Sequence, residues 1–183
     1  MKIVVGVTGA SGAQYAQALL RSLDRHDVDL VLSEDAKKVI AHEMGDDVKG
    51  FAKLAANVYA NSDTAAPPSS GSYRFDAMVV IPCSMGTLGK IAWGISVNLI
   101  ARAASVCMKE HRKLILVPRE TPLAATHLEN MLKLANQGVV ILPAMPGFYH
   151  GPKTLDDLVN FVVGKVLDQL GIEHHLFKRW RGE

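Results

Sequence analysis

A turn of small residues, TGASG at 8–12, follows the first apolar run of the chain. Its glycines let backbone N–H groups approach a ligand closely, and Ser11 adds a hydroxyl just before a stretch at 13–26 with helical periodicity. N–H groups and the dipole at a helix N-terminus attract anions. The turn therefore predicts a phosphate or nucleotide site, and the alternative is a strand–helix turn that holds no ligand.

The spacing of the glycines argues against a nicotinamide dinucleotide. They fall at 6, 9 and 12, which matches neither G-x-G-x-x-G nor the P-loop. In dinucleotide-binding proteins an acidic residue binds the ribose near the end of the second strand, whereas the strand predicted here at 28–33 ends in Ser33 followed by Glu34. Both features disfavour an NAD-dependent oxidoreductase.

A second turn with small and hydroxyl-bearing residues, PCSMGT at 82–87, follows another buried run. Two such turns on neighbouring strand ends suit the two ends of one ligand, a ribityl phosphate and a ring system. The alternative is a helix cap in which Ser84 or Thr87 satisfies free N–H groups. Cys83 has no evident histidine partner, so we interpret it as a buried thiol rather than a nucleophile.

Charged residues at three places suggest chemistry without defining it. Arg119 and Glu120 directly follow an apolar run at 113–118, as a structural ion pair or as a site for phosphate and proton transfer. Arg102 and Lys109 are seven residues apart, hence on roughly one helix face, which is usually solvated. Lys165 lies among valines of the last apolar helix, where a lysine often extends its ammonium to the surface.

The elements that must position these residues alternate along the chain. Such alternation predicts an α/β fold: a doubly wound, mainly parallel sheet with helices on both faces, Rossmann-like or flavodoxin-like, in a single domain over 1–183. Ligands bind such sheets beyond the carboxyl ends of the strands, where both turns lie. The expected strands are 3–8, 28–33, 76–84, 113–118 and 138–143, and the expected helices are 13–26, 34–45, 86–110, 124–137 and 154–170, with a weaker helix near 47–56.

Composition excludes several other classes. The 183 residues carry a formal net charge of +2, so only the short KRWR cluster at 178–181 is strongly basic and we expect no nucleic-acid partner. No apolar segment approaches the roughly 20 residues that cross a bilayer, and no secretory signal is evident, so we expect a cytoplasmic protein. The two cysteines form no C-x-x-C pair, and the adjacent His174 and His175 lack a third ligand, so we expect no metal site and both histidines at the surface.

Five segments, taken in order, closely resemble the UbiX-type flavin prenyltransferases, and the resemblance runs from the first strand to Trp180. It implies a metal-independent transferase that joins the dimethylallyl group of dimethylallyl monophosphate to N5 and C6 of reduced FMN. The prenylated FMN would serve a UbiD-type decarboxylase, and the enzyme would be a homo-oligomer, usually a dodecamer. The segments are GVTGASG, CSMGTL, NLIARAASVCMKE, VPRETPL and MPGFYHGP, and the ending LFKRW resembles the family's tail.

The resemblance also implies roles for individual residues. Glu43 and Glu120 would manage protons, Arg102 would brace the site, and Trp180 would close it on a tail, 171–183, that covers the active site or a neighbouring subunit. Trp93 is a second aromatic candidate. The donor phosphate would bind Lys109, Arg119, Tyr149 and Lys165. FMN would bind Gly9, Ala10, Ser11, Gly12, Ser33, Ser84, Met85, Gly86, Thr87 and Arg119.

Two positions depart from the family pattern, and alternatives remain. Gly86 stands where relatives often have lysine, and Val97 stands where an acid is expected. A flavin-dependent cysteine decarboxylase would need an early catalytic histidine, for which His42 is the nearest, and an asparagine where Pro146 stands. A non-catalytic FMN carrier would need no second phosphate site. The donor is a monophosphate or a diphosphate, and the modest number of cations favours the monophosphate.

Overall fold

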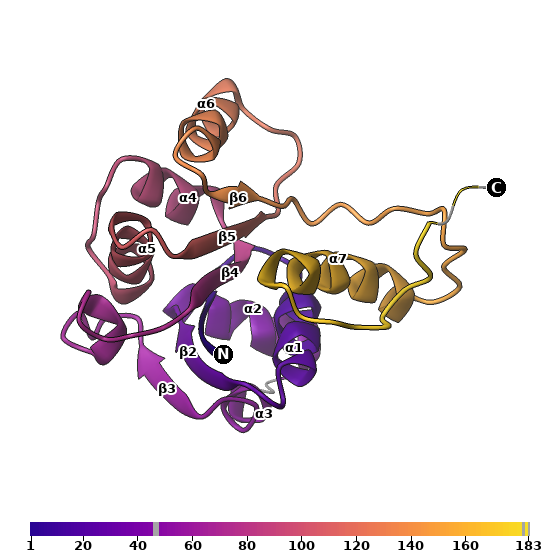
Figure 1. The fold of residues 1–183 in the computed structure, drawn as a ribbon, viewed down its shortest axis with the longest axis horizontal. Coiled ribbons are helices and arrows are strands. Elements are labelled where there is room, and N and C mark those ends of the chain that lie inside the picture. Colours follow the sequence, from indigo (N-terminus) through magenta and orange to yellow (C-terminus); the bar gives the residue numbers. More distant parts are fainter. Residues whose placement is uncertain (46–47, 181, 183) are drawn as a thin grey trace.

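A six-stranded sheet forms the centre of the structure, a computed structural model that describes residues 1–45, 48–180 and 182 (Figure 1). Its order is β3-β2-β1-β4-β5-β6, and every strand pairing is parallel. The order reverses between β1 and β4, which is the switch point where doubly wound sheets bind ligands. The strands are β1 (Lys2–Val7), β2 (Asp27–Leu32), β3 (Asn57–Ala60), β4 (Ala77–Cys83), β5 (Lys113–Pro118) and β6 (Val140–Ile141).

Helices cover both faces of this sheet (Figure 1), so the doubly wound α/β prediction is confirmed. Helices α1, α2 and α7 pack on the face that carries Ile3 and Val5, and α4 and α5 pack on the face that carries Val4 and Met78. None of the described helices has the length and apolar character that crossing a bilayer requires. The helices are α1 (Ala13–Ser22), α2 (Glu34–Met44), α3 (Val48–Ala52), α4 (Met85–Ala92), α5 (Leu99–Lys109), α6 (Ala125–Ala135) and α7 (Leu155–Leu170), with a 3-10 turn at Pro67–Ser69.

One strand differs from the sequence prediction. Strand β3 was not expected, because it lies at the sheet edge and its sequence, NVYA, is mostly exposed and lacks an apolar run. It is held in part by a side-chain bond from Asn57 to the buried Asp29, at 2.9 Å. The helical patterns expected over 86–110 form two helices, because Gly94 adopts a φ of 67° and Asn98 begins a new helix by accepting from the N–H of Ala101.

Thr8 fastens the carboxyl ends of β1 and β4 together. Its buried hydroxyl donates to the carbonyl of Pro82 and accepts from the N–H of Ser84, both at 2.7 Å. The N–H of Arg119 donates to the carbonyl of Cys83 at 3.4 Å, which connects the end of β5 to the same place. Three loops that the sequence singled out are thereby fixed relative to one another.

Replacing Thr8 tests this connection. In Thr8→Val the shape is kept, but the N–H of Ser84 loses the hydroxyl as its partner, while the carbonyl of Pro82 keeps the backbone N–H of residue 8, 3.3 Å away, so we expect the free energy of unfolding to fall by about 1–3 kcal/mol. Urea unfolding at a fixed protein concentration measures the change. Thr8→Ser retains the hydroxyl and serves as the control; equal losses in both variants would show that the methyl group, not the hydrogen bonds, matters.

Candidate functional site

The turn at 8–12 requires glycine at two positions. A Cβ on Gly9 would lie 2.5 Å from the Cβ of Asp35, so only glycine lets the first turn of α2 approach this loop. Gly12 has a φ of 109°, in the left-handed region that favours glycine. Within the described chain, the N–H groups of Gly9 and Ala10 have no hydrogen-bond partner. They remain available to an anion.

The other half of the turn is already occupied by a carboxylate from α2. Glu43 accepts hydrogen bonds from the N–H groups of Gly12, at 3.0 Å, and Ala13, at 2.9 Å, and from the side chain of Ser11. Burial alone would raise the pKa of Glu43, but these bonds and the nearby charge of Arg119 hold it below its usual value. Glu43 is therefore a carboxylate at neutral pH, ready to accept a proton.

Arg119 faces this carboxylate from the end of β5. Its Nε is buried and has no hydrogen-bond partner among the described residues. A buried donor without a partner is costly, so the arrangement is incomplete without an added acceptor. No ion pair joins Arg119 to Glu120 within the described residues, and Glu120 instead accepts from the N–H of Thr121 at 3.0 Å. The structural ion pair is thus not the arrangement found.

The hydroxyls after β2 and β4 act as helix caps. Ser33 accepts from the N–H of Ala36 at 3.0 Å, and Ser84 accepts from the N–H of Thr87 at 3.4 Å. The cap alternative for Ser84 is therefore confirmed, and the residue still stands at the ligand-binding edge of the sheet. A Cβ added to Gly86 would meet nothing within 4 Å, so open space adjoins this turn.

Cys83 ends β4 beside this turn but is not suited to attack a substrate. Its side chain is fully buried. Burial raises the pKa of the thiol to about 12. The interpretation of Cys83 as an inert buried thiol is confirmed.

Tyr149 and Trp180 lie together in the segments that flank α7, and Lys165 is on α7 itself. The loop after β6 runs out beside α7, and the tail after α7 returns along the same helix (Figure 1). Tyr149 and Trp180 meet edge to face, with ring centroids 5.8 Å apart. No hydrogen bond or ion pair in the described chain joins Tyr149 or Lys165 to Arg119. We call the segment 144–180 the arm.

Arg102 and Lys109 occupy a third place, on α5, and both are exposed as the sequence predicted. The Nε of Arg102 donates to the carbonyl of Ser69 at 3.0 Å. Lys109 ends α5 and pairs with Glu110, just before β5 begins at Lys113. Strand β5 runs from there to Arg119. Lys109 therefore lies at the amino ends of the strands, whereas the two turns lie at their carboxyl ends. A single chain does not bring Lys109 to Arg119.

Large apolar side chains are exposed on both the arm and the body. Trp93 and Val97 lie on the loop between α4 and α5, and Trp180, 69% exposed, lies at the end of the arm. Exposed apolar groups of this size mark surfaces that contact other molecules. The remaining ones are Met1, Val58, Ile95, Leu128, Leu132, Met145, Phe148, Tyr149 and Leu155.

Comparison with known proteins assigns the family. The Flavoprotein family model matches residues 1–167. The chain is 54% identical to the flavin prenyltransferase UbiX of Methanocaldococcus jannaschii, over 98% of each protein, and 52% identical to that of Thermoplasma acidophilum, over 98% of this chain and all of the other. The chain belongs to the Flavoprotein family, among its UbiX flavin prenyltransferases.

Solved structures of relatives agree with this assignment. A dodecameric FMN-dependent UbiX-like decarboxylase from Escherichia coli O157:H7 superimposes with a TM-score of 0.97 at 49% identity, over the whole of both chains. AnUbiX (PadA1), in complex with FMN and dimethylallyl pyrophosphate, gives 0.97 at 42% identity, over 100% of this chain and 98% of that one. The peptidyl-cysteine decarboxylase EpiD gives 0.65 at 20% identity, over 92% of this chain and 97% of its own, and shares the fold alone.

Sequence reasoning missed several residues that shape the site. Thr8 was not singled out as a connector, and Asp168 was not singled out at all. His174 was expected at the surface, but its side chain is 5% exposed and hydrogen-bonded to Asp168, so that expectation was wrong. His175 is exposed as expected, and Arg181 of the basic cluster lies outside the described residues.

The charge on Glu43 predicts a pH-dependent contribution to stability. Because its folded pKa lies below the ordinary value of 4.5, the contribution is present above that value and is lost as the pH falls through the folded pKa. We expect Glu43→Gln to lower the free energy of unfolding at neutral pH by about 0.5–1 kcal/mol, as for other carboxylates at helix N-termini.

The gap between wild type and Glu43→Gln should narrow as the pH falls from neutral through the folded pKa, because the wild-type side chain itself becomes protonated there. Thermal unfolding over a series of acidic pH values, at one ionic strength, measures it. A gap of the same size in acid would mean that the substitution acts through packing and not through charge.

Proposed function

We propose that the protein transfers the dimethylallyl group of dimethylallyl monophosphate to N5 and C6 of reduced FMN and so makes prenylated FMN. The observation that carries the proposal is the 54% identity to a flavin prenyltransferase over 98% of each chain. The product would pass to a UbiD-type decarboxylase. Two free, buried cysteines suit a reducing compartment, and we place the reaction in the cytoplasm.

The residues at the carboxyl edge fit FMN. Among the residues that the structure describes, the N–H groups of Gly9 and Ala10 and the Nε of Arg119 have no hydrogen-bond partner, and open space adjoins Gly86. Bound reduced FMN supplies the nucleophilic ring positions N5 and C6. Its phosphate would lie near residues 9–12 and Ser33, and its ring would lie along residues 84–87 beside Arg119.

Positive side chains would hold the leaving phosphate. Breaking an allylic C–O bond leaves a delocalised carbocation and a phosphate, and cations placed where that charge develops lower the barrier. Lys109, Arg119 and Lys165 supply such charge without a metal ion, and Tyr149 supplies a hydroxyl donor. Lysine at 165 gives a point charge that suits a terminal phosphate. The number of cations favours the monophosphate over the diphosphate.

Carboxylates would take up the proton that leaves when the new ring closes. For the second bond to form, the remaining double bond of the transferred group would gain a proton and C6 would lose its hydrogen, so a proton donor and a base are both needed there. Glu43 is ionised at neutral pH, with a pKa below its usual value, so it would serve as a base and not as the donor. Glu120, beside Arg119, is the second candidate, and the released phosphate can act as a further base.

We propose that the complete site forms between copies of the chain. Lys109 lies at the opposite ends of the strands from Arg119, Lys165 is on α7, and the loop after β6, which carries Tyr149, runs outward beside that helix (Figure 1). The exposed Trp93, Val97 and Trp180 suit contact between copies, and a relative of the same fold is described as dodecameric. Arg102 would brace a neighbouring copy's site, and the tail at 171–183 would close one.

The structure also bears on the departure at Val97 from the family pattern and on the two alternative functions, a cysteine decarboxylase and an FMN carrier. Val97 is exposed on the loop before α5, where an apolar residue suits a subunit boundary. Pro146 still stands in place of the asparagine that a cysteine decarboxylase needs, and the likeness to such an enzyme is one of fold alone. A carrier that binds FMN without using a donor remains the functional alternative that an activity measurement must exclude.

Incubation of the purified protein with FMN, dithionite and dimethylallyl monophosphate should increase the flavin mass by one C5H8 unit. Lys109→Ala and Glu120→Gln should lower the rate by about 100-fold or more, because each removes a group that stabilises charge or moves a proton. Lys38→Ala, at an exposed surface ion pair, is the control. A bound flavin of unchanged mass, with both the monophosphate and the diphosphate supplied, would favour the carrier.

Mixed oligomers test whether copies share a site. Lys109→Ala and Arg119→Ala chains, each inactive alone, are co-expressed with different tags and purified through both. If the two residues of one site come from different chains, random assembly leaves about a quarter of the sites intact and activity returns to that level. If both residues come from one chain, every site carries a defect and the mixed oligomer stays inactive.

A further inference from the structure

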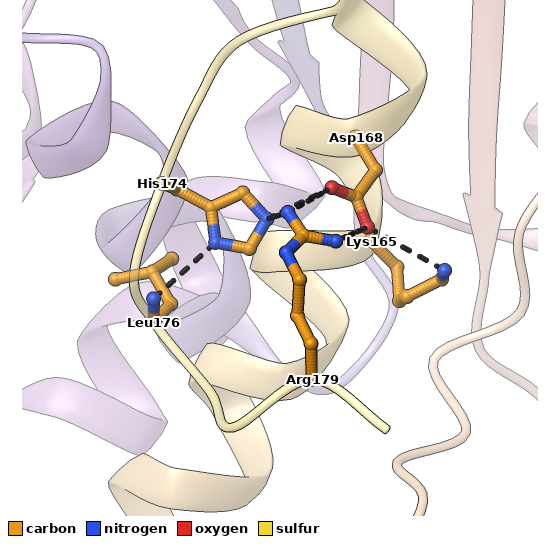
Figure 2. Close-up of polar contacts among 5 residues, drawn as sticks. All are labelled: Lys165, Asp168, His174, Leu176 and Arg179. Carbon is orange, nitrogen blue, oxygen red and sulfur yellow. Dashed lines mark hydrogen bonds and ion pairs between the residues drawn. The ribbon is translucent and has the colours of Figure 1, made fainter. Parts of the chain in front are cut away.

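Asp168, in the last turn of α7, binds three hydrogen-bond donors, from Lys165, His174 and Arg179 (Figure 2). Its Oδ1 accepts from Arg179 Nη2 at 2.7 Å and lies 3.1 Å from His174 Nε2. Its Oδ2 accepts from Arg179 Nη1 at 3.3 Å and from Lys165 Nζ at 3.5 Å. One carboxylate therefore joins the helix, the returning tail and a lysine proposed to bind the donor phosphate.

The hydrogen-bond pattern fixes how His174 takes part. Its Nδ1 accepts from the N–H of Leu176 at 3.2 Å, so Nε2 carries the hydrogen that is donated to Asp168; Arg179 Nη2, 3.3 Å from the same Nε2, then has the carboxylate and not this nitrogen as its acceptor. Burial disfavours a charged Asp168, yet the bonds from Arg179 and His174 hold the pKa of Asp168 below its usual value. The carboxylate thus stays ionised and keeps its hold on the tail.

Close packing accompanies these bonds. A Cβ on Gly164 would lie 2.5 Å from the ring of Phe177 and 2.6 Å from that of His174, so the tail rests directly on the helix backbone. Phe177 also packs on Phe161, with ring centroids 4.9 Å apart, and Phe161 in turn meets Tyr149 at 5.7 Å. The tail then ends with Trp180 edge to face with Tyr149.

We propose that Asp168 is a positioning residue of the prenyl-donor site, which docks the tail so that Trp180 lies against Tyr149 and keeps Lys165 within reach of the donor phosphate. This inference rests on the proposed function. In this proposal Asp168 acts through Lys165 and the tail and not by binding the donor itself.

The distances show which contact yields when the donor binds. Arg179 makes two bonds to Asp168, the shorter at 2.7 Å, whereas Lys165 makes one at 3.5 Å and is 45% exposed. Two cations share one carboxylate, so a phosphate finds positive charge that Asp168 does not neutralise. Lys165 turns to the phosphate, and Arg179 stays with Asp168 and holds the tail in place.

The test uses the full-length enzyme loaded with FMN. Asp168→Asn keeps the shape but loses the charge, and we expect the KM for dimethylallyl monophosphate to rise about ten-fold while the FMN Kd changes less than about two-fold. Asp156→Asn, in the first turn of the same helix, is the matched control and should leave both constants unchanged. A donor KM within two-fold of wild type, or an equal loss of FMN affinity, overturns the proposal.

Tail docking is measured without activity. Trypsin cleavage after Lys178 and Arg179 should be about ten-fold faster in Asp168→Asn than in wild type, because local opening of the tail exposes these bonds. Gly164→Ala keeps the carboxylate but removes the space for Phe177, so it should also speed cleavage and raise the donor KM. Unchanged cleavage in both variants overturns the docking role.

A double-mutant cycle separates a shared interaction from general loss of stability. Asp168→Asn combined with Arg179→Gln should raise the donor KM no more than either change alone, since both remove one contact. If the two substitutions together raised the donor KM by the product of their separate fold-changes, the shared role of Asp168 and Arg179 would be overturned. If wild type transfers no prenyl group, the proposed function and the donor role fail together, while the trypsin result still decides whether Asp168 docks the tail.

Discussion

A single buried hydroxyl determines where the parts of this site stand. The side chain of Thr8 uses both its donor and its acceptor at the switch point of the sheet, and it joins the loop that follows β1 to the loop that follows β4. The N–H of Thr8 also donates to the carbonyl of Pro82, at 3.3 Å, so the hydroxyl adds to a backbone contact and also binds the N–H of Ser84. The N–H of Arg119, just after β5, donates to the carbonyl of Cys83 beside this point. Hydrogen bonds therefore join the turn at 8–12, the Ser84 cap and the start of the loop that carries Arg119 into one unit.

Charge at this unit is only partly balanced. Glu43 fills the N-terminal end of α1 in the way a bound anion would, and it does so beside a guanidinium whose Nε has no partner among the described residues. Without a ligand, the Glu43 carboxylate holds the turn. It thereby occupies two N–H groups, those of Gly12 and Ala13, that would otherwise be open to an anion. What remains, the N–H groups of Gly9 and Ala10 and one side of Arg119, is a smaller anion site than the turn alone suggests. The proposed flavin phosphate would use this remainder, while Glu43 keeps its bonds to the N–H groups of Gly12 and Ala13.

The sequence was informative where burial controls structure. Continuous apolar runs marked the central strands, and the rule that ligands bind at strand ends placed both turns and Arg119 correctly at one edge. Strand β3 was not predicted, because a strand at the sheet edge needs no apolar run. No local sequence pattern indicates that Glu43 caps α1, because that helix begins 30 residues earlier in the chain. The position of Lys109 could have been predicted from the sequence, because a helix that leads into a parallel strand must end near the amino ends of the strands. Helical periodicity shows only which face of the helix a residue occupies, not at which end of the strands it lies.

The separation of the cations has a consequence for the chemistry. An allylic carbocation is destroyed by water, so the place where it forms must be dry. In one chain the aromatic side chains proposed to surround it, Trp180 above all, are exposed, and Lys109 is on the wrong edge of the sheet. Assembly of several copies would bury these aromatic groups and bring the cations together in the same step. A chain that kept every catalytic group to itself would hold its reactive centre open to solvent, whereas a shared site becomes both dry and complete only when the oligomer forms.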